Sequence, residues 1–121
     1  LAEEFKPEII LANGGSDPHF ADSLGSLALT VQGFFKISRT IVDVAKKVCR
    51  GRVVLMPGSG YNPSVLPCCW YALTAGVIGL EAINVSDPYT PPVEPKGVRL
   101  TVENMLAELK QNLRPYWKCF K

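Results

Sequence analysis

Two short stretches of the sequence combine glycine with side chains that can take part in catalysis. Residues 13–19 read Asn-Gly-Gly-Ser-Asp-Pro-His, so the carboxylate of Asp17 lies beside the only histidine of the chain, His19. Residues 57–63 read Pro-Gly-Ser-Gly-Tyr-Asn-Pro and present the phenol of Tyr61. A carboxylate can ligate a hard or borderline cation, and a phenol can donate a hydrogen bond to a developing oxyanion. Together the two stretches would suit a metal-dependent hydrolase.

The same residues allow two other interpretations. In the plainest one, glycines and prolines mark ordinary exits from strands, Asp17 caps a turn and Tyr61 is a half-buried aromatic. In the other, the Gly-Ser-Gly of residues 58–60 precedes a helix and binds phosphate. That stretch lacks both a Lys-Ser/Thr pair and a full Gly-x-Gly-x-x-Gly. The residue types alone leave all three interpretations open.

Each stretch follows an apolar run that we predict to be a buried strand, over residues 8–13 and 52–57. Between them, residues 31–49 place apolar side chains at spacings of three and four, which predicts a helix. Thr30 is a suitable N-cap, and Gly51 offers a left-handed stop. A strand, a long helix and a second strand build a parallel sheet. Both stretches therefore belong to the carboxyl edge of one sheet, where such folds bind ligands.

A second helix is predicted over residues 63–79, apolar nearly all round. The uncharged stretch 65–80 is shorter than the ~20 residues that span a bilayer and contains Pro67, so we expect a buried helix. Four prolines in the fifteen residues 83–97 indicate a surface connector. A last amphipathic helix, capped by Thr101, and an aromatic tail follow. We therefore expect three parts, which are an α/β domain (1–83), a connector (84–100) and a terminal helix with its tail (101–121).

Composition excludes several other classes of protein. The net charge of +2 is too small to indicate binding to nucleic acid or to an anionic membrane. The acidic N-terminal residues contain no apolar signal-peptide segment, and we expect a cytoplasmic protein. The four cysteines show no Cys-x-x-Cys spacing, which argues against a zinc knuckle. We expect them to be reduced thiols that act as small core hydrophobes, namely Cys49, Cys68, Cys69 and Cys119.

The two stretches, taken with their surroundings, resemble one family. FKPEIILANGGSDPHFADSLGSLALT and RVVLMPGSGYNPSVLPCCW are similar to two ordered motifs of the zinc-dependent histone deacetylase and acetoin-utilisation protein superfamily. The resemblance covers about residues 5–80. It implies the C-terminal part of an α/β domain of the arginase/deacetylase type, with a parallel sheet in a three-layer α/β/α arrangement.

The resemblance also implies roles for individual residues. Asp17 matches a zinc-binding aspartate. Tyr61 matches the tyrosine that acts with zinc to stabilise the tetrahedral oxyanion. Asp22 matches a recurrent aspartate, for which we favour a role in bracing its loop. The residues that match the walls of the acyl-lysine tunnel are Leu24, Ser59 and Gly60.

Some positions depart from the family pattern. Pro57 and Ser59 replace glycines, and Cys68 stands where many members carry arginine, so substrate preference is open. His19 imitates the histidine of an Asp-x-His ligand pair, but that family pair lies on an earlier strand, and we do not expect His19 to bind metal. The family's other ligands and its general-base histidines have no counterpart in this sequence.

These matches predict part of a zinc-dependent deacetylase. It would hydrolyse acetyl-lysine or an acetylated small amine to acetate and a free amine. The rest of the zinc site would come from the N-terminal part of the same domain. The chain alone should be inactive and should self-associate through exposed apolar surface. The alternative is a non-catalytic interaction or structural module that pairs with a complementary chain.

Overall fold

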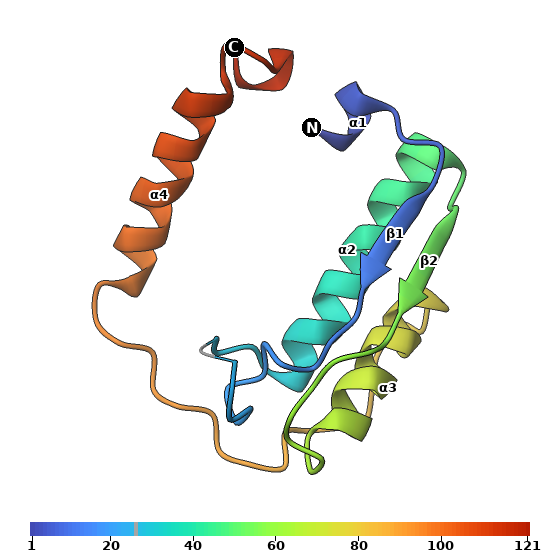
Figure 1. The fold of residues 1–121 in the computed structure, drawn as a ribbon, viewed down its shortest axis with the longest axis vertical. Coiled ribbons are helices and arrows are strands. Elements are labelled where there is room, and N and C mark those ends of the chain that lie inside the picture. Colours follow the sequence, from blue (N-terminus) through green and yellow to red (C-terminus); the bar gives the residue numbers. More distant parts are fainter. Residues whose placement is uncertain (26) are drawn as a thin grey trace. The chain divides into compact units, whose positions relative to one another are not determined.

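The computed structural model describes residues 1–25 and 27–121, and these residues form two units. The larger unit comprises residues 7–92. Its elements follow the predicted order along the chain (Figure 1): β1 (Ile10–Asn13), α2 (Val31–Cys49), β2 (Val53–Met56) and α3 (Leu66–Val77). The mixed α/β character expected from the sequence is confirmed. The boundaries expected at residues 84 and 100 stay a prediction.

The sheet consists of β1 and β2, which run parallel and pair from Ile10 with Val53 to Asn13 with Met56. The face that carries Ala12 is buried, and Leu55 on that face packs against the core formed by α2 and α3. The opposite face is apolar and open, because Leu11 is 62%, Val54 43% and Met56 47% exposed. Helices cover one face of the sheet in the described residues, and the third layer stays a prediction.

Helix α2 begins and ends where the sequence predicts. The Thr30 hydroxyl accepts a hydrogen bond from the Gly33 N–H at 3.1 Å, which satisfies one of the unpaired amides of the first turn. At the other end Arg50 (φ 57°) and Gly51 (φ 78°) both adopt left-handed conformations that stop the helix. Its buried side chains pack against α3 to form the core, which comprises Val31, Phe34, Phe35, Val65, Cys69, Ala72, Leu73 and Ala75.

Helix α3 is shorter than predicted and is buried on one side only. Cys69 and Leu73 are buried, whereas Tyr71 is 45% exposed. Within residues 1–25 and 27–121, the structure has no helix that is both long and apolar enough to cross a membrane.

All four cysteines are free thiols, as expected, but Cys119 is exposed and is not the core side chain that was predicted. Cys49 and Cys69 are buried, and burial raises the pKa of the Cys69 thiol to about 12, with a smaller contribution from nearby Cys68. A thiol that stays protonated is a poor nucleophile. Cys69 therefore acts as a core side chain.

The smaller unit comprises residues 1–6 and 93–121. It contains α1 (Ala2–Phe5), α4 (Val98–Leu113) and the short 3₁₀ helix η1 (Lys118–Phe120). The Glu4 carboxylate joins its two ends by accepting hydrogen bonds from the N–H groups of Lys118 (2.8 Å) and Cys119 (3.0 Å).

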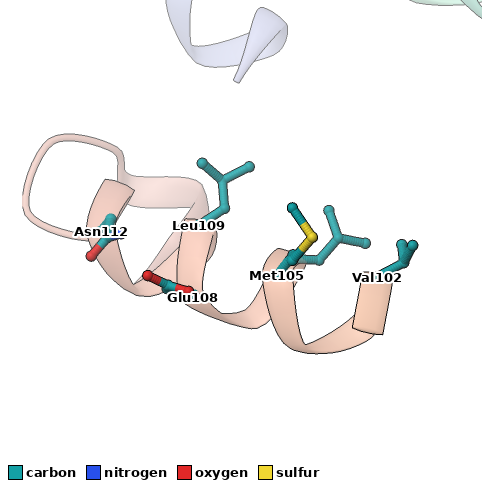
Figure 2. A pocket seen from close by; sticks show the side chains of 6 residues that line it. Val102, Met105, Glu108, Leu109 and Asn112 are labelled. Atoms are coloured by element: carbon teal, nitrogen blue, oxygen red, sulfur yellow. The ribbon is translucent and has the colours of Figure 1, made fainter. Parts of the chain in front are cut away.

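Helix α4 starts earlier than the sequence suggests. Thr101 is not the N-cap, because it lies within the helix and its hydroxyl donates to the Gly97 carbonyl at 3.2 Å. Gly97, with φ of 87°, makes the turn that starts the helix. Figure 2 shows Val102, Met105 and Leu109 on one side of α4, where all three are exposed. Packing of this apolar side stays a prediction.

Candidate active site

The first loop of the site extends from the end of β1 to α2 and is organised around Asp22. The buried Asp22 carboxylate accepts hydrogen bonds through Oδ1 from the backbone N–H groups of Leu24 (3.0 Å) and Gly25 (3.2 Å). Its other oxygen, Oδ2, accepts from the Tyr61 N–H at 2.8 Å. One buried carboxylate therefore closes its own turn and fixes the backbone of the second loop.

Further hydrogen bonds join the two loops. The Ser59 hydroxyl donates to Asp17 Oδ1 at 2.5 Å, and the Ser59 carbonyl accepts from the Ser16 N–H at 2.7 Å. The Asn62 side-chain amide donates to the Ala21 carbonyl at 2.7 Å. The structure thus brings together the loops of Asp17 and Tyr61, which lie more than 40 residues apart in sequence.

Two glycines allow the loops to approach this closely. A Cβ atom on Gly15 would overlap the Ser59 hydroxyl and the Asp17 carboxylate. A Cβ atom on Gly60, whose φ is 147°, would overlap the Ser16 hydroxyl. These glycines leave room for the opposite loop, in addition to the chain turning that glycine permits.

In the folded chain Asp22 stays ionised to a lower pH than an ordinary aspartate does. Burial opposes ionisation, but the hydrogen bonds from the backbone of Tyr61, Leu24 and Gly25 outweigh it and lower the pKa of this carboxyl below its ordinary value of 3.8. Because the unfolded chain then binds this proton more tightly than the folded chain, the ionised carboxylate stabilises the fold above pH about 4. That stabilisation is lost as the pH falls further, through the lowered pKa.

The variant Asp22→Asn should therefore melt at a lower temperature than the unaltered chain at pH 7, because an amide cannot accept hydrogen bonds at both ends. The difference should shrink as the pH falls below about 4, because the unfolded chain takes up this proton before the folded chain does. Thermal unfolding followed by circular dichroism at each pH measures this difference. A difference that stays constant from pH 7 to pH 3 would contradict the assignment.

His19 is wholly buried, and both of its ring nitrogens have partners within the protein. Nδ1 accepts a hydrogen bond from the Ala21 N–H at 3.0 Å, so the ring proton is on Nε2 and points to the Asp87 carboxylate 2.8 Å away. An imidazole engaged in this way has no lone pair left for a cation.

The two side chains expected to face a substrate are accessible. Tyr61 is 57% exposed although its backbone N–H is held by Asp22, and Leu24 is 69% exposed. Ser59 and Gly60 are partly exposed beside them in sequence. A phenol on a fixed backbone and an exposed leucine are compatible with the predicted roles, which stay predictions.

With this geometry described, comparison with known proteins identifies the family. A family model described as a histone deacetylase domain matches residues 1–77. The chain belongs to the histone deacetylase family. A probable deacetylase of Archaeoglobus fulgidus is 33% identical over the whole chain, which corresponds to 35% of that relative's length. The match to this histone deacetylase and acetoin-utilisation superfamily confirms the resemblance inferred from the two motifs.

Other members of the histone deacetylase family match shorter stretches. The acetoin utilization protein AcuC of Staphylococcus aureus is 30% identical over 79% of the chain and 27% of its own length. Histone deacetylase 14, chloroplastic, of Arabidopsis thaliana is 41% identical over half of the chain and 14% of its own length. The chain thus spans about a third or less of the relatives that it matches.

Zinc is the metal of the family, and Asp17 is the ligand predicted for it in this chain. Within residues 1–25 and 27–121, no group of three histidine, cysteine, aspartate or glutamate side chains lies in an arrangement that could hold a metal ion. Asp17 is only partly buried, and its Oδ1 accepts a hydrogen bond from the Ser59 hydroxyl. A structural or catalytic zinc needs three or four protein ligands, so these residues do not make a complete site.

The sequence did not identify two residues that hold the loops, Asn62 and Asp87. Asn62 had a possible signal, because an asparagine after Gly-Tyr and before proline is typical of a turn that hydrogen-bonds through its side chain. Asp87 had none, because it lies 68 residues from His19 in sequence and only the folded chain brings the two together.

Proposed function

We propose that this chain forms part of the active site of a zinc-dependent deacetylase, in which Asp17 is one ligand of the metal and Tyr61 donates a hydrogen bond to the oxyanion. The observation that carries the proposal is the hydrogen-bonded joining of the Asp17 and Tyr61 loops in a member of the histone deacetylase family. Zinc bound at such a site supplies a Lewis acid for the acetyl carbonyl and for water.

The residues of the chain then have distinct tasks. The Ser59 hydroxyl occupies Asp17 Oδ1 and leaves Oδ2 for the metal. Asp22 fixes the backbone of Tyr61, so that the accessible phenol donates to the oxygen on which charge develops. Water adds to the acetyl carbon, the C–N bond breaks and the nitrogen takes up a proton. The products are acetate and a free amine, from acetyl-lysine or an acetylated small amine.

The remaining ligands come from a complementary part of the same domain in this proposal. No group of three potential metal ligands lies together in the described residues, and the chain spans about a third of its archaeal relative. The chain by itself should then bind zinc weakly or not at all and should not hydrolyse acetyl-lysine.

A complementation assay tests the proposal. The chain is mixed with the complementary segment of its domain, and acetate release from an acetyl-lysine peptide is followed with and without a zinc chelator. We expect turnover only when both pieces and zinc are present, and none with Asp17→Asn in place of the unaltered chain. The matched variant Asp43→Asn, on the exposed surface of α2, should behave as the unaltered chain does. Association without turnover would overturn the enzymatic proposal and favour the interaction module.

The open face of the sheet leads to a further prediction. Leu11, Val54 and Met56 form an apolar surface on adjacent strands, and the outer edges of both strands lack a partner in the described sheet. Such surfaces promote association. Light scattering on the purified chain should therefore give a mass above the 13.2 kDa of one copy. A homogeneous monomer at micromolar concentration would contradict the prediction.

A further inference from the structure

The segment that follows α3 is attached along α2. The Leu80 carbonyl accepts a hydrogen bond from the Arg39 guanidinium at 2.6 Å, and the Val85 carbonyl accepts from the Gln32 side chain at 3.3 Å. The Val85 side chain also packs against the core of the larger unit. The segment therefore follows α2 from its middle to its N-terminus. The next acidic residue, Asp87, lies at this N-terminus.

Asp87 joins the N-terminus of α2 to the first loop of the candidate site. One oxygen, Oδ1, lies 2.8 Å from the Val31 N–H and 2.8 Å from Nε2 of His19. The Asp87 side chain is only 12% exposed. A carboxylate at this end of a helix is favoured by the unpaired amides and by the helix dipole. Asp87 Oδ1 therefore accepts hydrogen bonds from both the first turn of α2 and the His19 ring.

His19 connects Asp87 to the loop that carries Asp17, because its ring contacts Asp87 and its backbone bonds within that loop. Its ring is wholly buried and stacks near Phe34 of α2, with 6.4 Å between the ring centres. The backbone N–H of His19 donates to the Ser16 carbonyl at 3.0 Å, and the His19 carbonyl accepts from the Asp22 N–H at 2.9 Å. Asp17 therefore lies within a turn whose two ends are both held by the backbone of His19.

We propose that Asp87 is a positioning residue for the active site, acting through His19 on the turn that presents Asp17. Its effect on catalysis rests on the proposed deacetylase function, whereas its effect on the loop does not. The segment after α3 then belongs to the active-site structure, although its composition indicates a connector.

The single histidine makes the contact directly observable by nuclear magnetic resonance. Long-range ¹H–¹⁵N spectra of the chain report which ring nitrogen carries the proton. The unaltered chain should show a neutral ring protonated at Nε2, and Asp87→Asn should retain it, because the amide oxygen can still accept from both donors. Asp87→Ala should lose the single tautomer and should increase amide-hydrogen exchange across residues 16–22 at least tenfold. The control Asp43→Ala, on the exposed surface of α2, should change neither the His19 tautomer nor the amide exchange of residues 16–22.

The wild-type spectrum alone can overturn the proposal. A ring protonated at Nδ1, or one that exchanges rapidly with solvent, would show that the contact with Asp87 is absent, whether or not Asp87→Ala folds. Unchanged loop exchange in a folded Asp87→Ala chain would overturn it as well.

The catalytic consequence is measured in the complemented enzyme. Asp87→Ala should lower kcat by about 10- to 100-fold, the range found when the support of a metal ligand is removed, and Asp87→Asn should restore most of it. A loss of loop order without loss of kcat would overturn the positioning role. If the unaltered complemented protein has no activity, the deacetylase proposal fails, while the spectra still decide the contact of Asp87 with the loop.

Discussion

Replacing Tyr61 with phenylalanine should lower the kcat of the complemented deacetylase by about 10²–10³, the loss that accompanies removal of one oxyanion donor. The substitution removes a single oxygen. The hydrogen bond that fixes position 61 is donated by its backbone N–H to Asp22, so the loop should keep its structure. The KM for an acetyl-lysine peptide should change little, because the donor acts on charge that develops in the transition state.

Steady-state kinetics on the two forms measures the effect, and Tyr71→Phe is the matched control. Tyr71 lies on α3, is comparably exposed and takes no part in the site, so its variant should retain full activity. A decrease in kcat of less than threefold for Tyr61→Phe would show that Tyr61 is not the oxyanion donor. The histone deacetylase family membership would stand, because it rests on the whole match over residues 1–77.

The variant Gly25→Ala should destabilise the chain by about 3 kcal/mol, near the upper end of the range for overpacking. A Cβ atom on Gly25 would overlap the backbone carbonyl of Asp17, and a backbone atom cannot rotate aside as a side chain can. The N–H of Gly25 is also held by Asp22, so relief of the overlap would break the turn that presents Asp17.

Chemical denaturation followed by circular dichroism measures the change in the free energy of unfolding. Gly58→Ala is the matched control, because a Cβ atom there would meet nothing closer than the Met56 carbonyl at 3.9 Å. Its effect should stay within about 0.5 kcal/mol. Equal stability of the two variants would show that the Asp17 carbonyl lies farther from Gly25 than described.

Local sequence patterns predicted the elements of the larger unit well. The helix expected over residues 31–49 is present with those bounds, because its periodicity, its Thr30 cap and its left-handed stop all depend on neighbouring residues. Both strands were predicted two residues too long. Glu8 and Ile9 precede β1, and Arg52 and Pro57 flank β2 outside the paired register. The Thr101 cap was wrong because a glycine turn four residues earlier starts the helix first.

The candidate site was predictable in outline only. The βαβ order placed the Asp17 and Tyr61 loops at the same edge, and hydrogen bonds do join these loops. The partners within the site were not predictable, because they depend on side-chain directions across about 40 residues of sequence. Asp87 is the extreme case, since its polar surroundings in the sequence are typical of an exposed connector.

The close approach of the two loops restricts how this part of the protein can evolve or be engineered. Gly15 accommodates Ser59 of the other loop, and Gly60 accommodates Ser16 in return. A larger residue at either glycine must therefore be accompanied by a smaller one across the interface. A loop grafted from a relative with different substrate preference should succeed only when both loops are transferred as a pair.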